Sequence, residues 1–289
     1  MEFPFPVQVN LSLKEYCTFG IGGHAEYLIE ISSPEMAQQA LSFCSAKGLP
    51  YLILGKGSNS LIADNGFAGL VIVNKIDTLY TSPEGLFIAG AGYSFSRLGS
   101  FTARNGWGGL EFAAGIPAAV GGAVYMNAGA NGGEAFDTLV HVDYVKENGA
   151  LVRLNKQQIA HSYRHTIFQQ ERGIILAAAF QLSPSAEAKQ KQLQIIERRK
   201  ATQPLREKSA GCIFCNPCSG PAGALIEQAG LKGFAVGGAK VSEIHANFIV
   251  NTGKATAADV LQLIETVQTK VQEKFGVCLK SEVRQLGFN

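Results

Sequence analysis

Three cysteines in the C-terminal third of the chain have a spacing that could form a metal site or place a reactive thiol. Cys212, Cys215 and Cys218 form a C-x2-C-x2-C pattern within "SAGCIFCNPCSGP". Thiolates bind zinc and iron–sulfur clusters, and a protonated thiol can act as an acid. A bacterial ferredoxin run would continue with a nearby fourth cysteine, but the next one is Cys278, and structural zinc takes four ligands in paired spacings. The spacing therefore argues against a metal site and leaves the role of each thiol open.

Two glycine-rich loops are candidates for binding a nucleotide cofactor. The loop "LGKGSNSLIADNGFAG" (54–69) offers N–H groups and short hydroxyls that suit a pyrophosphate, although it lacks the P-loop and G-x-G-x-x-G patterns. The loop "GLEFAAGIPAAVGGAVYMNAGANGGE" (109–134) can lie against a flat ligand, and Pro117 is predicted to start a helical turn facing it. A tight turn and close helix–sheet packing explain each loop without a ligand. Together, the two loops favour a nucleotide cofactor outside the Rossmann class.

Composition limits the possible partners. The chain has 289 residues, of which 46% are hydrophobic and 17% charged, with a net charge of +2 and no basic block. We therefore expect a globular protein without a nucleic-acid partner. The N-terminus does not read as a signal peptide, no run reaches the roughly 18 apolar residues of a membrane span, and six cysteines in such a chain indicate reduced thiols. A cytoplasmic protein without a membrane partner is expected.

Strands and helices are both predicted, which indicates an α+β protein. Local signals are clearest for a helix over 33–48, with Ser33 as its N-cap and Gly48 after its end, and for a hairpin over 141–154 turning at Asn148–Gly149. Further strands are predicted at 25–31, 51–54, 69–74, 85–92, 173–182, 247–251 and 277–286, and further helices at 95–105, 184–203, 222–230 and 255–275. A shift to polar composition after Ser183 predicts a domain boundary there.

An ordered set of motifs resembles one enzyme family. The stretches "YCTFGIGGHAEYLIEI", "LGKGSNSLIADNGFAGLVI", "GLEFAAGIPAAVGGAVYMNAGANGGE", "SYRHTIF", "SAGCIFCNP", "GGAKVSEIHANFIVN" and "LKSEVRQLG" follow one another along nearly the whole chain. This pattern is similar to the UDP-N-acetylenolpyruvoylglucosamine reductase (MurB) family, in its shorter form without an extra substrate-covering loop.

The resemblance implies a fold, a reaction and a set of partners. Residues 1–183 are expected to form an FAD-binding fold of the vanillyl-alcohol-oxidase (PCMH) type, and residues 184–289 a C-terminal α/β substrate domain. The implied reaction is the NADPH-dependent reduction of UDP-N-acetylglucosamine enolpyruvate through FAD, in peptidoglycan precursor synthesis. The substrates are then the UDP-sugar and NADPH, no metal is needed, and we expect a monomer or weak dimer.

The resemblance also assigns residues. Those implied to hold FAD are Gly55, Gly57, Ser58, Asn59, Ser60, Gly115, Ile116, Pro117, Gly121, Gly122, Ala123, Asn127, Gly129 and Ala130. Those implied to contact substrate are Tyr163, Asn216 and His245, and those implied to be catalytic are Arg164, Cys212 and Glu282.

The implied chemistry asks for one cation and one acid. Hydride addition to an enolpyruvyl alkene builds negative charge into its carboxylate, which Arg164 can pair with in a fork, with Glu282 hydrogen-bonding or orienting a donor. Cys212 stands where most members of the family have Ser, and a thiol of ordinary pKa about 8.5 is the stronger acid of the two. An oxidase of the same flavin fold and a cofactor-carrying sensor without turnover are the alternatives. Outside the family context, Arg164 would be a surface residue, Glu282 a solvent-facing strand residue and His245 a core histidine.

Overall fold

The computed structural model describes residues 1–288, and the chain divides into two compact units. The first unit comprises residues 1–8, 27–56 and 69–198, and the second comprises residues 9–26, 57–68 and those from Arg199 onward. The predicted boundary after Ser183 differs from this division. The polar stretch after Ser183 forms helix α5 (Ala188–Thr202), which continues through the changeover at residue 198, and two N-terminal segments pack with the C-terminal residues.

A five-stranded antiparallel sheet forms the centre of the first unit. Its strands follow the order β12-β11-β15-β7-β6, with all pairs antiparallel. Their bounds are β6 Leu79–Thr81, β7 Leu86–Gly90, β11 Leu139–Lys146, β12 Leu151–Asn155 and β15 Gly173–Gln181. The predicted hairpin is confirmed, since β11 and β12 join through Gly149 at φ 81°.

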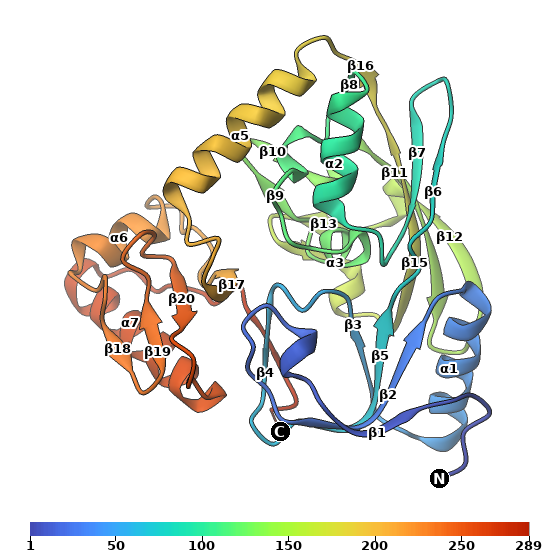
Figure 1. Cartoon of the computed structure of the whole chain (residues 1–289), viewed down its shortest axis with the longest axis horizontal. Coiled ribbons are helices and arrows are strands. Elements are labelled where there is room, and N and C mark those ends of the chain that lie inside the picture. The colour runs from blue at the N-terminus through green and yellow to red at the C-terminus, as the bar shows by residue number, and fades with distance from the viewer. Residues whose placement is uncertain (289) are drawn as a thin grey trace. The chain divides into compact units, whose positions relative to one another are not determined.

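Helices cover this sheet and bury a large apolar core with it. α2 (Phe95–Arg104) and α3 (Val120–Tyr125) lie against one side of the sheet, as Figure 1 shows, and contribute to one cluster with β7, β11 and β15. Ser94 caps α2 by accepting a hydrogen bond from Arg97 N. Because Asn105 ends α2, the predicted helix over 95–105 is confirmed within a residue.

A smaller sheet and one helix form the second core. β3 (Tyr51–Leu54) pairs in parallel with β5 (Phe67–Asn74), in a sheet of order β1-β2-β5-β3 that includes β1 (Gln8–Ser12) and β2 (His24–Ile31). α1 (Pro34–Lys47) begins after its N-cap Ser33, whose side chain accepts from Met36 N, and ends at Gly48 with φ 61°. These caps confirm the predicted helix ends.

Several short elements complete the first unit. They are β8 Trp107–Gly108, β9 Gly129–Ala130, β10 Gly133–Glu134, β13 His161–Ser162, β14 His165–Thr166, β16 Ser183–Pro184, α4 Ala135–Thr138, and the 3-10 helices η2 Glu111–Ala113, η3 Lys156–Gln158 and η4 Ile167–Gln169. β16 pairs with β8, so the helix predicted from residue 184 begins only at Ala188.

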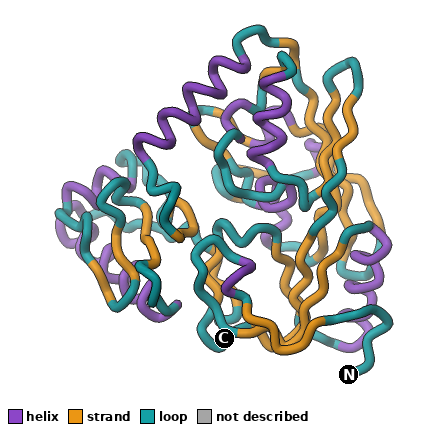
Figure 2. The backbone as a smooth tube through the Cα atoms, viewed as in Figure 1, coloured by secondary structure: helices purple, strands orange, loops and turns teal. Residues whose placement is uncertain are grey.

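The second unit combines a short antiparallel sheet with helices, which are drawn in orange and purple in Figure 2. The sheet has the order β17-β20-β19-β18, and a separate parallel pair joins β4 to β21. The bounds are β4 Ser60–Ile62, β17 Lys208–Cys212, β18 Ala235–Val236, β19 Ala239–Val241, β20 Phe248–Asn251, β21 Arg284–Leu286, α6 Ala222–Gln228, α7 Ala257–Phe275 and the 3-10 helix η1 Lys14–Tyr16. The strand predicted over 277–286 is mostly wrong, because only β21 and an isolated bridge from Ser281 to Phe214 form.

Loop residue Asp64 fixes the start of α7. Its carboxylate accepts hydrogen bonds from Ala257 N (2.8 Å) and Ala258 N (3.1 Å), and Thr256 and Asp259 add a capping box. The helix N-terminus is thereby tied to the loop that follows β4. Within residues 1–288, no helix combines the length and apolar character needed to cross a bilayer.

Candidate active site

Arg164 lies at the turn of a short hairpin in the first unit. β13 and β14 pair antiparallel, which leaves Tyr163 and Arg164 as the two turn residues. Arg164 has φ 59°, in the left-handed region that residues other than glycine rarely adopt. Its Nη2 donates to the carbonyl of Gly129 at 2.6 Å and its Nη1 to that of Asn127 at 3.4 Å. The guanidinium is therefore held by two backbone carbonyls of the segment 127–129, which lies outside the hairpin.

Polar side chains fix the backbone on both sides of Arg164. Gln169 Nε2 donates to the Arg164 carbonyl at 3.0 Å and to that of Tyr125 at 3.2 Å. Fully buried Asn127 donates to the Ser162 carbonyl at 3.1 Å and accepts from Phe136 N at 3.2 Å. These bonds hold a backbone conformation that costs about 1–3 kcal/mol elsewhere, and such strain clusters at functional sites. The sequence did not indicate this role of Gln169, because no local motif distinguishes it from the other glutamines of the chain.

Tyr163, predicted to contact substrate, reaches solvent. Its side chain is 51% exposed, and the Arg164 guanidinium carbon lies 4.9 Å from the centre of its ring. The ring can therefore support the cation from one face.

The second glycine loop packs partly on protein. A Cβ on Gly121 would meet Ala91 Cβ at 2.8 Å, and a Cβ on Gly129 would meet the Gly133 carbonyl at 2.7 Å. These two glycines are required by close packing in the β7 and β9–β10 regions. Gly122 differs: it is exposed, and a Cβ there would meet nothing within 4 Å. Gly122, like Gly132 of the same run, thus presents bare backbone to an open surface.

The remaining predicted residues of this loop have mixed positions. Gly115 N donates to Ser96 Oγ at 2.7 Å with its own φ at 86°, and Ala123 is fully buried in the core. Ile116 packs against the same core, and Ala130 pairs with Gly133. The prediction that Pro117 starts a helical turn is wrong, because α3 begins at Val120 after an extended N-cap, Ala119.

The first glycine loop spans the division between the units. Gly55, in the first unit, would place a Cβ 3.3 Å from Ala119 Cβ. In the second unit, Gly57 has φ 58° and a Cβ there would strike the Tyr16 carbonyl at 2.3 Å. Ser58 and Asn59 are half-buried, whereas Ser60 is buried in β4. Among the predicted residues of this loop, Ser58 and Asn59 therefore carry the more accessible side chains.

Glu282 lies just before β21 in the second unit, and its backbone is bonded on both sides. Its N–H donates to the Ile213 carbonyl at 2.7 Å, and its carbonyl accepts from Asn59 Nδ2 at 3.1 Å. The side-chain Oε2 lies 3.9 Å from Cys215 Sγ, which donates to it. Cys215, whose role the sequence leaves open, is therefore a direct neighbour of the predicted catalytic carboxylate.

Cys212 ends β17 opposite Phe248 of β20, after an irregularity at Gly211, which has φ 78°. Burial lowers the pKa of the Arg199 guanidinium, while its charge interaction with Cys212 acts to raise that pKa. Arg199 Nε is buried without a hydrogen-bond partner. Sequence reasoning missed Arg199, since one arginine in "ERRK" carries no distinguishing signal.

His245 and Asn216 are both engaged by local backbone. His245 Nδ1 accepts from Asn247 N at 3.2 Å, and burial lowers the pKa of this histidine. The imidazole is therefore neutral, with its proton on Nε2. Asn216 Oδ1 accepts from Ala222 N at 3.0 Å and so caps the start of α6.

No three His, Cys, Asp or Glu side chains within residues 1–288 come together as a metal-binding group. Cys218 and Cys278 are exposed, whereas Cys212 and Cys215 are half-buried.

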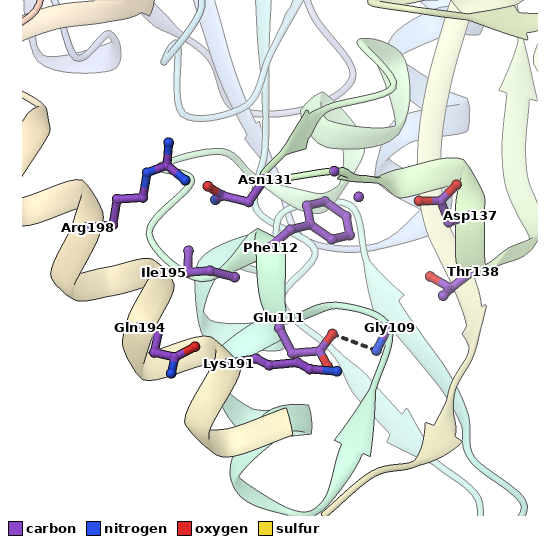
Figure 3. Close-up of a pocket in the computed structure, with 12 residues that line it drawn as sticks. Gly109, Glu111, Phe112, Asn131, Asp137, Thr138, Lys191, Gln194, Ile195 and Arg198 are labelled. Atoms are coloured by element: carbon purple, nitrogen blue, oxygen red, sulfur yellow. Dashed lines mark hydrogen bonds between the residues drawn. The ribbon is translucent and has the colours of Figure 1, made fainter. Parts of the chain in front are cut away.

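A cavity of 520 Å³ lies in the first unit and contains none of the predicted site residues (Figure 3). Lys191, Ile195 and Arg198 of α5 line one wall, and Phe112 faces them. Glu111 Oε2 accepts from Gly109 N at 2.7 Å on its floor.

Comparisons with known proteins first define the class. Residues 25–155 match a model described as an FAD binding domain, so the first unit carries the fold of a flavoprotein. Residues 203–286 match the model for the UDP-N-acetylenolpyruvoylglucosamine reductase C-terminal domain.

Relatives that match over the full length then define the family. A UDP-N-acetylenolpyruvoylglucosamine reductase of Protochlamydia amoebophila is 54% identical, covering 100% of this chain and 97% of the relative. A UDP-N-acetylenolpyruvoylglucosamine reductase of Chlamydia muridarum is 44% identical, covering 99% of this chain and 96% of the relative. The crystal structure of UDP-N-acetylenolpyruvylglucosamine reductase (MurB) from Thermus caldophilus is 37% identical, with a TM-score of 0.83 over 97% of this chain and 99% of that one. The chain belongs to the UDP-N-acetylenolpyruvoylglucosamine reductase family, and the predicted fold class is confirmed.

The residues present fit FAD. Exposed Gly122 offers backbone without a side chain in the way of a flat ring system, and the left-handed turn at Gly57 leads into the short side chain of Ser58. Donors on glycine and serine can approach a pyrophosphate closely.

Proposed function

We infer that this protein is an NADPH-dependent, FAD-containing reductase that converts UDP-N-acetylglucosamine enolpyruvate into UDP-N-acetylmuramate for peptidoglycan synthesis. One observation carries this function: 54% identity to a reductase of this name over the whole chain. When bound, FAD accepts a hydride from NADPH and delivers it to the terminal carbon of the substrate alkene. The chain itself must bind the substrate carboxylate and supply one proton.

For the first of these tasks we propose Arg164. Hydride addition places an electron pair on the neighbouring carbon, and the charge spreads into the carboxylate as an enolate. A guanidinium can pair with both carboxylate oxygens, and this attraction strengthens as the charge develops. The bonds to Gly129 and Asn127 support the assignment, because they orient the guanidinium before the charge appears.

For the second task we propose Cys212 as the proton donor. Its S–H bond breaks as a C–H bond forms on the enolate carbon, which leaves a thiolate and the lactyl ether. The charge interaction between Arg199 and Cys212 supports this assignment, since a positive charge nearby stabilises the thiolate that remains.

Glu282 is proposed to act on the substrate carboxylate or on the donor. Its carboxylate already accepts from the Cys215 thiol, so it is oriented before substrate binds. His245 is proposed to contact the substrate as a neutral donor through Nε2, in keeping with its bond to Asn247 N. Asn216 is engaged at α6 through Oδ1, so any substrate contact would come from its Nδ2.

For the cofactor we propose the loops predicted from the sequence, with two refinements. Ser58, which follows the left-handed turn at Gly57, is the central pyrophosphate contact, and Gly122 faces the flat ring. Gly121 and Gly129 act by allowing the chain to pack closely, because atoms of Ala91 and Gly133 occupy the space that a side chain at these positions would need. We also propose that the protein is a monomer or weak dimer in the cytoplasm, because NADPH and nucleotide sugars are available there.

Two measurements test this function. The purified protein should be yellow, with about one FAD per chain. NADPH oxidation should depend on the enolpyruvyl sugar and yield one lactyl ether per NADPH consumed. Reduced flavin that reacts rapidly with oxygen and ignores the UDP-sugar would instead indicate an oxidase.

A further inference from the structure

Asn59 belongs to the loop assigned to the FAD pyrophosphate, yet its side chain is bonded elsewhere. Its Nδ2 donates to the main-chain carbonyl of Glu282 at 3.1 Å, across 223 residues of sequence. We propose that Asn59 is a positioning residue that holds Glu282 in place for reduction of the substrate. This inference rests on the proposed function, which gives Glu282 its role.

The geometry around Glu282 shows what Asn59 adds. β4 and β21 pair in parallel with Ser60 opposite Arg284, and Arg284 N donates to the Asn59 carbonyl at 3.0 Å. The Glu282 carbonyl lies beyond the end of this ladder. At that point the Asn59 side-chain amide donates the hydrogen bond that a main-chain N–H of β4 would donate if the pairing continued.

Two bonds from opposite sides therefore fix the Glu282 peptide groups. The Glu282 N–H is bonded to Ile213 at 2.7 Å, and its carbonyl is bonded to Asn59. Ile213 directly follows Cys212. The bond to Ile213 therefore connects Glu282 to the proposed proton donor, and the bond from Asn59 connects it to the cofactor loop. Loss of the Asn59 donor frees the carbonyl side alone.

The consequence for the reaction is specific. The Glu282 carboxylate is half-buried and lies 3.9 Å from Cys215 Sγ, so a small backbone shift changes where its oxygens lie. Displacement of a catalytic group by about 1 Å can cost roughly a hundredfold in rate. Because Glu282 is needed only when substrate is reduced, the effect should fall on the second half-reaction and leave flavin reduction by NADPH unchanged.

The experiment measures both half-reactions by anaerobic stopped flow in Asn59→Ala and Asn59→Asp. Alanine removes the amide, and aspartate keeps its shape but replaces the donor with an acceptor facing the Glu282 carbonyl. Because Asn59 Nδ2 is bonded to Glu282, the contact of Asn59 with the cofactor falls to its main chain, which both variants keep. We expect FAD content and flavin reduction to stay within about twofold of the parent, and reoxidation by substrate to fall about tenfold or more.

Two control variants separate this effect from cofactor loss and from general destabilisation. Ser58→Leu alters the neighbouring residue and should lower FAD content. Asn251→Ala removes another amide of the second unit, which donates to the Phe19 carbonyl at 3.0 Å, and should leave reoxidation unchanged in the folded holoenzyme.

A double-mutant cycle with Glu282→Gln gives the decisive readout. Asn59→Ala should cost about tenfold in reoxidation in the parent and less than about twofold in the Glu282→Gln background, because residues that act together are non-additive. Equal effects in both backgrounds, or loss of FAD from folded Asn59 variants, would overturn the positioning role. If Glu282→Gln itself reoxidises normally, the proposed role of Glu282 fails instead. If both Asn59 variants fold and react as the parent does, Glu282 keeps its role and Asn59 loses its own.

Discussion

The Arg164 and Glu282 regions hold their predicted catalytic side chains in opposite ways. At Arg164 the backbone is strained into the left-handed region, and the side chain is bonded directly to the carbonyls of Gly129 and Asn127. At Glu282 the backbone is bonded on both sides, by Ile213 and Asn59, and the side chain meets a weakly donating thiol. The first arrangement fixes a permanent cation through its side chain, whereas the second fixes a carboxylate mainly through its backbone.

The largest effect is expected at Cys212, which the second region adjoins. Cys212→Ala should lower flavin reoxidation by substrate about 10²–10⁴-fold, the range for loss of a general acid, while flavin reduction by NADPH stays near normal. Stopped-flow measurement of the two half-reactions checks this. Cys212→Ser should retain substantial activity, because a hydroxyl occupies nearly the same place. If the alanine variant reoxidises as fast as the parent and still forms product, Cys212 is not the acid.

Arg164→Ala should come next, with a loss of about a hundredfold in reoxidation, comparable to removal of one oxyanion donor. Arg164→Lys is the informative partner variant. Lysine keeps the charge but cannot bond two carbonyls and a carboxylate through one planar group, so it should recover only part of the rate. Full recovery with lysine would show that charge alone matters and that the orientation by Gly129 and Asn127 does not.

A smaller effect is expected from Gln169, which bonds the Arg164 carbonyl. Gln169→Leu should slow reoxidation about tenfold, because it removes the donor that stabilises the left-handed turn. Gln181→Leu is the matched control, since Gln181 Nε2 also donates to a backbone carbonyl, that of Glu84, at 2.7 Å. Equal effects from the two variants would mean that Gln169 acts only through stability.

The smallest effect concerns pH and compares one histidine from each unit. Burial lowers the pKa of both His141 and His245, so each is kept neutral in the native state. As pH falls below about 6.5, the unfolded chain takes up protons that the native state does not, and stability falls by at most about 1.4 kcal/mol per pH unit for each group. Urea unfolding between neutral pH and the acid range should show a shallower slope for His245→Gln and for His141→Gln. An unchanged slope in both variants would contradict the neutral assignments.

Sequence reasoning succeeded where the signal was local. The ends of α1 were predictable because Ser33 and Gly48 are themselves the caps, and the β11–β12 hairpin because Asn148–Gly149 defines its turn. It failed where the partner is distant. The strand predicted over 277–286 shrinks to β21, since its partner β4 offers only three residues.

The candidate site shows the same limit. A motif could place Arg164, Cys212 and Glu282, but it could not show that Asn59 bonds Glu282 or that Cys215 faces it. Nor could a run of glycines reveal that Gly121 packs on Ala91 while Gly122 lies open. Such roles depend on which residues, distant in the sequence, the fold brings into contact, and the local spacing of residues does not indicate these contacts.

The central claim is that one bound flavin links NADPH to the enolpyruvyl sugar. The most direct test adds NADPH and then UDP-N-acetylglucosamine enolpyruvate, in sequence and without oxygen, to the purified protein while its flavin absorbance is recorded. NADPH should bleach the flavin band, the substrate should restore it fully, and one UDP-N-acetylmuramate should form per flavin reoxidised. A flavin that stays bleached when the substrate is added, or that recovers without forming this product, would show that the flavin does not link the two reactants.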